Sequence, residues 1–438
     1  MSDQTLAKPN ALVHVVGIGG VGMNAVAQAY RAMGYAVTGS DRLLDQGQQT
    51  DVLDKLSQAG IGLFSQDGTG VQADTHAVIV SSAIEPDNPD LLAARERGIA
   101  VWHRAEALAK LVGDAHVIAI AGTSGKTTVT GMVGWLLTQL GLNPNVVNGG
   151  ELLNWQRVDR IGNVQITGSD WWVLEVDESD RSLLHFQPDW AVLTNISADH
   201  FSLAESVALF ESFAAKVSTG IIVGDQCADF NLTRTGSPAK RFQAGEGSDL
   251  VLPVHLPGRH NRENAALAIA LCEAMGFERA ECIEHLSAFQ GVARRLQLVG
   301  NANDILVYDD YAHNPAKIHA AWTAVRGADR RVLGVWRPHG YGPLKAMMTE
   351  LVEMFASTSQ PDDHIYVLPV YYAGGTADRS VDSDQLVARL QAKGLSASYV
   401  EGYAQLKDVL NNVKQAGDAV LCMGARDPDL PKFARTLT

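Results

Sequence analysis

A turn with the composition of a phosphate-binding loop lies within residues 117–137, VIAIAGTSGKTTVTGMVGWLL. Glycines 122 and 125 permit unusual backbone angles, and the amides that open the following helix can face an anion. Lys126 adds a positive charge, and a threonine hydroxyl at 127 or 128 can bind Mg²⁺. These residue types predict a site for a nucleoside triphosphate. The alternative is a glycine-rich turn with a surface lysine.

The spacing of this turn differs from the usual P-loop, because Ile120 stands where that spacing has glycine. The match is therefore to a shorter G-T-x-G-K-T form. We assign the nucleotide phosphates to Gly122, Thr123, Ser124, Gly125, Lys126, Thr127 and Thr128.

A second glycine loop lies near the N-terminus, where Gly17, Gly19 and Gly22 form G-x-G-x-x-G after a strand-like run. Asp41 ends the next such run, at the position where dinucleotide-binding proteins have an acidic residue. The pattern indicates a diphosphate and says little about which nucleotide bears it. Taken alone it also fits a nicotinamide dehydrogenase, although such an enzyme has no use for Lys126.

Acidic residues and a histidine follow two neighbouring strands of the predicted central sheet. Glu175 lies in EVDESD with three further carboxylates, and Asp199 and His200 end TNISADH. Because parallel strands end at one edge of a sheet, these ligands can hold magnesium beside the loop phosphates. We select Glu175 and His200 for that role, and we interpret Asp180 as part of a solvated loop.

Further polar residues are typical of nucleotide contacts from the far side of a cleft. They are found in PGRHNRENA, GVARRLQ and DDYAHNP and comprise His260, Asn261, Asn264, Arg294, Arg295, Asp309, Asp310 and His313. Each feature alone has an ordinary explanation, because asparagines often cap helices and pairs of arginines are often simply exposed to solvent.

The composition sets the class of protein. A chain of 438 residues exceeds one ordinary core and predicts two or three domains. The net charge of −14 argues against general binding of nucleic acid or anionic membranes. Four scattered cysteines, no signal-peptide pattern and no apolar run of membrane-spanning length predict a cytoplasmic protein. No dimer surface is assigned.

Short β-type runs alternate with helical patterns along the chain, which predicts parallel sheets covered by helices and an α/β fold. The runs are 11–18, 35–40, 76–83, 116–122, 171–176, 190–195, 304–310, 331–336, 364–370 and 418–425. Breaks near 111–116 and 291–304 divide the chain into predicted domains 1–114, 115–298 and 299–438.

Taken together, the motifs resemble the Mur ligase family, most closely its alanine-adding branch. The matching segments are GIGGVGM, SSAIEPDNP, WHRAEAL, GTSGKTT, EVDESD, TNISADH, PGRHNRENA, GVARRLQ, DDYAHNP and RPHGYG. The resemblance implies a Rossmann-like first domain for a UDP-linked substrate, a central P-loop domain for ATP, and a Rossmann-like third domain for the amino acid. ATP would convert the carboxylate of a UDP-N-acetylmuramate-like substrate to an acyl phosphate, which an amine, by default L-alanine, would attack.

The resemblance also implies roles for individual residues. Lys126, Glu175, His200 and His313 form the catalytic set, with Thr127, Glu175 and His200 on Mg²⁺. Asn261, Asn264, Arg295 and Asp310 complete the ATP site. The substrate set comprises Gly19, Gly20, Gly22, Met23, Asp41, Ser81, Ser82, His103, Arg181 and His339.

Some positions depart from the family pattern. Ser124 replaces the usual histidine, Arg181 replaces a small residue, and Gly340 and Gly342 replace an arginine and a hydroxyl residue. These departures put the identity of the amine in doubt and keep open a sensor that has lost catalysis. Lys216 lies about where some members have a carbamylated lysine, and we interpret it as an ordinary surface lysine.

Overall fold

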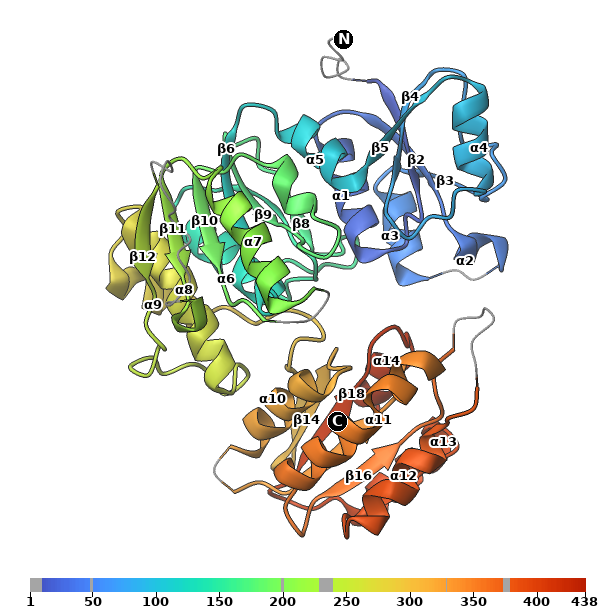
Figure 1. Cartoon of the computed structure of the whole chain (residues 1–438), viewed down its shortest axis with the longest axis vertical. Coiled ribbons are helices and arrows are strands. Elements are labelled where there is room, and N and C mark those ends of the chain that lie inside the picture. The colour runs from blue at the N-terminus through green and yellow to red at the C-terminus, as the bar shows by residue number, and fades with distance from the viewer. Residues whose placement is uncertain (1–9, 48–49, 198–200, 228–238, 328, 373–378) are drawn as a thin grey trace. The chain divides into compact units, whose positions relative to one another are not determined.

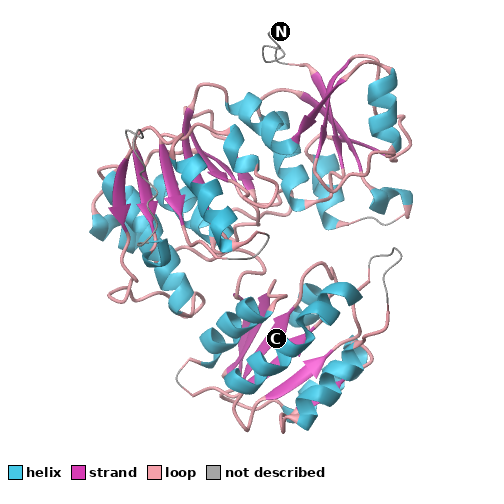
Figure 2. Cartoon of the chain, viewed as in Figure 1, coloured by secondary structure: helices cyan, strands magenta, loops and turns pink. Residues whose placement is uncertain are grey.

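The computed structural model describes residues 10–47, 50–197, 201–227, 239–327, 329–372 and 379–438. Three sheets covered by helices account for these residues, which confirms the predicted α/β class (Figures 1 and 2). The chain forms two compact units, residues 1–250 with 263–290, and residues 251–262 with 291–438. No described helix is both long and apolar enough to span a membrane.

The first sheet is entirely parallel, with the order β3-β2-β1-β4-β5. Its strands are β1 Leu12–Val16, β2 Ala36–Ser40, β3 Gly62–Phe64, β4 Thr75–Val80 and β5 Ala100–His103. Its helices are α1 Val21–Ala32, α2 Arg42–Asp45, α3 Asp51–Gln58, α4 Pro89–Glu96 and α5 Arg104–Val112.

The second sheet has the order β12-β11-β10-β6-β9-β7-β8 and is parallel except for the β7–β8 pair. Its strands are β6 His116–Ala121, β7 Asn145–Val147, β8 Val164–Gln165, β9 Trp171–Glu175, β10 Trp190–Leu193, β11 Gly220–Val223 and β12 Lys240–Gln243. The associated helices are α6 Lys126–Gln139, α7 Leu203–Ala214, α8 Arg259–Ala274 and α9 Arg279–Leu286, with short 3-10 turns at Ser182–His185 and Asp225–Cys227.

The third sheet has the order β13-β14-β18-β15-β16-β17, with β13 antiparallel to β14. Its strands are β13 Gln297–Ala302, β14 Ile305–Asp310, β15 Val332–Trp336, β16 His364–Val367, β17 Ala397–Tyr399 and β18 Ala419–Met423. Its helices are α10 Pro315–Arg326, α11 Tyr341–Thr358, α12 Ser383–Ala392, α13 Tyr403–Val413 and α14 Leu430–Arg435.

The burial of apolar side chains explains why the three sheets form two compact units. The first two sheets share one apolar core, and the first sheet has a smaller one on its other face. The third sheet has its own core on each face. All the predicted β-type runs contain strands. Seven described strands of two to four residues were not predicted, because so few residues show no clear period: β3, β5, β7, β8, β11, β12 and β17. The six-residue β13 was also missed. The predicted domain boundaries near 114 and 298 stay predictions, and β13 lies across the second of them.

Candidate active site

The loop that joins β6 to α6 has the geometry its glycines predict. Gly122 and Gly125 have φ values of 127° and 86°, which side-chain-bearing residues rarely adopt. A Cβ atom at Gly122 would lie 2.1 Å from the hydroxyl of Thr194. That same hydroxyl donates to the carbonyl of Ser124 at 2.6 Å. The loop therefore fits closely against the end of β10, and a larger residue at 122 would displace it.

Asn195 holds the middle of the same loop. Its Oδ1 accepts from the Ser124 amide and its Nδ2 donates to the Ser124 carbonyl, both at 2.9 Å. Its backbone carbonyl accepts from the amide of Thr123 at 3.1 Å. Three hydrogen bonds to one asparagine fix the loop before any ligand is bound, which lowers the entropy cost of binding.

Lys126 begins α6 and points back across the loop. Its Nζ donates to the Gly122 carbonyl at 2.7 Å and to Glu178 Oε2 at 2.5 Å. Burial raises the pKa of Glu178, although the lysine charge opposes the rise. In the free protein the Glu178 carboxylate therefore balances the charge of the Lys126 ammonium group. Without that carboxylate, the ammonium group would face the site predicted for the phosphates.

Glu175 lies at the end of β9, and both of its carboxylate oxygens accept hydrogen bonds from nearby residues. The Thr127 hydroxyl donates to Oε1 at 3.0 Å, and the Gly149 amide donates to Oε2 at 2.7 Å. A hydroxyl and a carboxylate oxygen are ligands that Mg²⁺ accepts, with nucleotide phosphates and water completing its shell. The described residues contain no group of three or more His, Cys, Asp or Glu side chains that could hold a metal ion. His200, the other predicted ligand, lies outside the described residues.

The two asparagines predicted for the ATP site both lie in α8. A Cβ atom at Gly125 would stand 2.7 Å from Asn264 Oδ1, so this side chain lies directly against the phosphate loop. Asn261 is 3% exposed and donates from Nδ2 to the Pro257 carbonyl at 2.8 Å. It belongs to the second compact unit.

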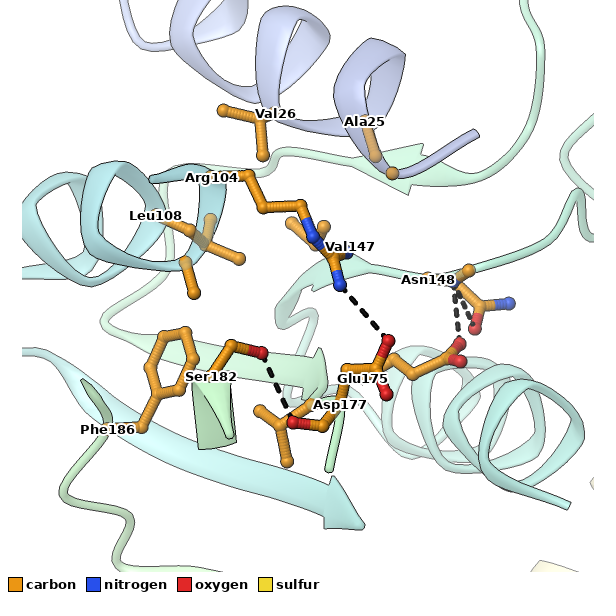
Figure 3. A pocket seen from close by; sticks show the side chains of 14 residues that line it. Ala25, Val26, Arg104, Leu108, Val147, Asn148, Glu175, Asp177, Ser182 and Phe186 are labelled. Atoms are coloured by element: carbon orange, nitrogen blue, oxygen red, sulfur yellow. Dashed lines mark hydrogen bonds and ion pairs between the residues drawn. The ribbon is translucent and has the colours of Figure 1, made fainter. Parts of the chain in front are cut away.

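A cavity lies where α1 and α5 meet the ends of β7 and β9 (Figure 3). We call it the reaction-side cavity, because it reaches Glu175 beside the phosphate loop. Its lining runs from Gly22 on α1 to Glu175 on β9. Arg104 extends into it and contacts Asp177 at 3.1 Å and Asp180 at 3.2 Å. The cavity thus joins the diphosphate loop to the carboxylate that contacts Thr127.

Neighbouring charges shift the pKa of Asp177, a carboxylate that lines this cavity. Burial alone would raise the pKa of Asp177, but Lys126, the Ser179 hydrogen bond and Arg104 together hold the pKa below its usual range. A Cβ atom at Gly22 would lie 2.8 Å from Arg104 Nη1, so the glycine leaves room for the guanidinium.

The N-terminal glycine loop is closed by Asp41. The Gly19 amide donates to Asp41 Oδ2 at 2.8 Å, and Oδ1 accepts from the Leu43 amide at the start of α2. Gly20 precedes the first residue of α1, where free amides favour an anion, and Met23 is buried. Asp41 is therefore a structural support of the loop, in addition to its predicted part in binding.

Other predicted substrate residues surround this edge of the first sheet. Ser81 and Ser82 follow β4 directly, and the Ser81 carbonyl accepts from the amide of Ile84. His103 caps α5 and lies 3.5 Å from Asp180 Oδ2. Burial lowers the pKa of His103, with the Asp180 charge opposing the fall.

Three predicted residues of the second unit lie at or just after the ends of β14 and β15, and two of them, His313 and His339, are in contact. Asp310 accepts from two amides, those of Leu296 at 2.5 Å and Ala312 at 2.6 Å, and burial raises its pKa. The rings of His313 and His339 lie 5.2 Å apart, edge to face. Burial lowers the pKa of His313 to about 4 and also lowers that of His339.

Sequence comparisons cover most of the chain. Residues 12–116 match the Mur ligase family catalytic domain, 120–208 the Mur ligase middle domain, and 294–426 the Mur ligase glutamate ligase domain. A UDP-N-acetylmuramate--L-alanine ligase of Rhizobium meliloti is 35% identical, across 96% of this chain and 95% of its own. One from Synechococcus sp. is 33% identical, across 94% and 89%.

The chain belongs to the Mur ligase family.

Solved structures agree with this assignment. A UDP-N-acetylmuramate-alanine ligase from Thermotoga maritima superposes with a TM-score of 0.77 at 25% identity, covering 97% of each chain. A murein peptide ligase from Psychrobacter arcticus shares the fold, with a TM-score of 0.67 at 23% identity and 98% coverage of each. As a Mur ligase, the chain is an ATP-dependent, ADP-forming amide ligase. The alternative of a nicotinamide dehydrogenase is therefore wrong.

The positions that depart from the Mur ligase pattern have distinct environments. Arg181 adopts a φ of 58°, and its guanidinium lies over the Phe201 ring at 5.4 Å. Lys216 is exposed just after α7 and donates to the Leu184 carbonyl at 2.6 Å. A Cβ atom at Gly342 would meet no atom within 4 Å, so the missing side chain leaves open space there.

Sequence reasoning missed several residues of this Mur ligase site. Arg104 lies in the quoted WHRAEAL segment but received no role. Asp180, interpreted as a solvated loop residue, has a side chain only 13% exposed and pairs with Arg104 and His103, so that interpretation was wrong. An arginine at the start of α5 was the available signal, because a partly buried charge favours a carboxylate partner.

Proposed function

We propose that this Mur ligase joins L-alanine to the carboxylate of UDP-N-acetylmuramate, with ATP converted to ADP and phosphate, in peptidoglycan precursor synthesis. The observation that best supports this is the double role of Glu175. It lines the reaction-side cavity and also accepts from Thr127 of the phosphate loop. The substrate carboxylate and the nucleotide phosphates would therefore meet at one protein carboxylate. The alanine ligases from two bacteria, about a third identical along nearly the whole chain, support the choice of substrates.

We propose Thr127 and Glu175 as protein ligands of Mg²⁺, with His200 as a further one. When bound, the ion would neutralise negative charge on the phosphates. Lys126 would move from Glu178 to the phosphates as they bind, because phosphate offers it a more highly charged partner. The amides of Gly125 and the first turn of α6 would hold the remaining phosphate oxygens.

The substrate carboxylate would attack the terminal phosphoryl group to give an acyl phosphate and ADP. The alanine amine would then attack the acyl carbon, release phosphate and form the amide. Arg104 would orient the UDP-linked substrate along the cavity, and exclusion of water would protect the acyl phosphate from hydrolysis. His313 stays neutral near pH 7 with its pKa near 4, and we assign it to the amine side of the reaction.

We assign one ligand to each of the three predicted domains. We propose that residues 1–114 bind the UDP part, 115–298 bind ATP, and 299–438 bind the amino acid, with Asn261, Asn264, Arg295 and Asp310 reaching the nucleotide. His339 and Arg181 would contact substrate on the amine side. ATP and nucleotide-linked sugars are cytoplasmic metabolites, which favours the cytoplasm as the location, and no nucleic acid or membrane partner is proposed.

A second candidate is a ligase for a larger amine, either another amino acid or a peptide. Glycines at 340 and 342 favour it, because the open space at Gly342 would admit more bulk.

Phosphate and ADP release with Mg-ATP and UDP-N-acetylmuramate, measured over the twenty amino acids and common cell-wall peptides with product masses recorded, tests both candidates. A product heavier by one alanine residue would establish the proposal. Product with a peptide but not with alanine would select the second candidate. Binding of both substrates without product for any amine would contradict both and favour a sensor.

A further inference from the structure

A second cavity, of about 530 Å³, lies at the opposite end of α1 from the reaction-side cavity. It is lined by the last turn of α1, by α3 with the turn after it, and by the segment 155–166 that leads into β8. The two linings follow each other along α1, the reaction-side cavity reaching from Gly22 to Val26 and the second cavity from Gln28 to Ala32. At 1.5 Å of rise per residue, Arg31 lies about 14 Å along the helix from Gly22 of the diphosphate loop. The volume of the second cavity is in the range of small-molecule sites.

The charge of this cavity is opposite in sign to that of the whole chain. Arg31, Lys55, Arg157 and Arg160 line it, against the single carboxylate of Asp159. The chain as a whole has a net charge of −14. Four cations gathered from three segments of an acidic protein make a local site of positive potential.

The arginines of the second cavity are positioned without being neutralised. The Arg31 guanidinium donates to the Ala59 carbonyl at 3.2 Å, and Arg157 donates to the carbonyls of Asn154 and Gln156 at 3.1 and 2.7 Å. Within the described residues, no carboxylate lies within 4 Å of these two or of Arg160. Lys55 alone is paired, with Asp51.

The backbone presents two of the three exposed arginines together. Arg157 and Arg160 form a two-way backbone bridge, each amide donating to the other's carbonyl at 3.2 Å. Both residues of this tight turn line the cavity. Planar guanidinium groups bind phosphate through paired hydrogen bonds, which a lone surface lysine does not.

An apolar wall completes the cavity. Trp155 lines it half-buried, and Ile161, Val164 and Ile166 lie alongside. The Trp155 ring packs on α6, because a Cβ atom at Gly134 would lie 3.2 Å from its edge. A cavity that combines an indole, aliphatic side chains and guanidinium groups suits an anion attached to an organic group better than a bare inorganic ion.

We propose that this second cavity binds a small organic phosphate, held through its phosphate by Arg31, Arg157 and Arg160. The site is separate from the reaction site and does not depend on the proposed alanine ligase activity. Two sources of the phosphate group share this chemistry, a nucleoside monophosphate whose base would lie against the apolar wall and a sugar phosphate.

Calorimetric titration of the full-length chain tests the proposal, with Mg-ADP present to fill the nucleotide site. AMP, glucose 6-phosphate and pyrophosphate are the three probes. They separate a base, a sugar and a phosphate group with no organic part. The variant R157Q/R160Q removes two charges from exposed positions, and R95Q/R389Q removes two exposed arginines elsewhere, Arg95 being held by a backbone carbonyl like Arg157. Pyrophosphate bound at the diphosphate loop would persist in both variants.

We expect AMP or glucose 6-phosphate to bind at one site per chain, with affinity at least about tenfold weaker in R157Q/R160Q and unchanged in R95Q/R389Q. The stronger of the two probes identifies the organic group. The proposal is overturned if neither binds at millimolar concentration, or if binding is equal in wild type and R157Q/R160Q. Ligase activity is measured on the same samples, so failure of the proposed function is seen independently.

Discussion

The cavities at the two ends of α1 differ in how their charges are compensated. On the reaction side, Arg104 lies against Asp177 and Asp180, and the nearby Lys126 lies against Glu178. In the second cavity, Arg31 and Arg157 bond to backbone carbonyls, which leave their charge intact. Paired charges keep a reaction site ordered before substrates arrive, whereas unpaired arginines gain a partner only when an external anion binds.

The largest effect is expected at the carboxylate shared by cavity and phosphate loop. Glu175→Gln keeps the shape of the side chain but removes the charge beside Thr127 and the proposed Mg²⁺. Turnover, measured as ADP release, should fall by about 10²–10³-fold. The matched control is Glu96→Gln, an exposed carboxylate on α4, which should leave turnover intact. Full activity in the Glu175 variant would remove this residue from the reaction.

A smaller effect is expected at Arg104. Arg104→Gln removes both of its ion pairs, so the UDP-linked substrate loses its orienting cation while the phosphate loop is untouched. The KM for UDP-N-acetylmuramate should rise about tenfold or more, with the KM for ATP nearly unchanged. Arg104→Lys should recover only part of the loss, because one ammonium group cannot repeat the forked contact. An equal rise in both KM values would contradict the assigned role.

The phosphate loop could be predicted because its chemistry is local. Gly122, Gly125 and Lys126 lie within five residues of sequence, between a buried strand and the start of a helix, and the structure places them as expected.

What could not be predicted depends on contacts between distant segments. Arg104 is separated from Asp177 by 73 residues, and Ser124 from Asn195 by 71. The second cavity has the same origin, since Arg31 and Arg157 come together only after α1 packs beside β8. No pattern within a sequence window reports such pairs. Asp180 was misjudged because its partners come from another part of the chain.

The pH dependence of stability should also distinguish the reaction side. The pKa of Asp177 lies below its usual value of 3.8 in the folded protein, so its ionised form contributes stability that is present above pH 4. That contribution is lost as the pH falls through the folded-state pKa. Because the side chain is 35% exposed and solvent screens the pair, Asp177→Asn should lower stability at pH 7 by at most about 1 kcal/mol.

Urea unfolding at pH 7 and at pH 3 measures this difference. The gap between wild type and Asp177→Asn should narrow at the lower pH. Asp159→Asn makes the same change at an exposed carboxylate of the second cavity and is the matched control. A gap that is equal at both pH values would show that Asp177 acts through packing and not through its charge.

The smallest effect on catalysis is expected from R157Q/R160Q. Both side chains are exposed, and they lie at the far end of α1 from Glu175, so turnover and both KM values should stay within about twofold of wild type. Steady-state kinetics over both substrates measure this directly. A rise in the KM for UDP-N-acetylmuramate like that of Arg104→Gln would mean that the substrate extends along α1 and that the two cavities form one site. Unchanged kinetics together with lost phosphate binding would make them two sites with different ligands, because the same substitution would then separate binding at one from catalysis at the other.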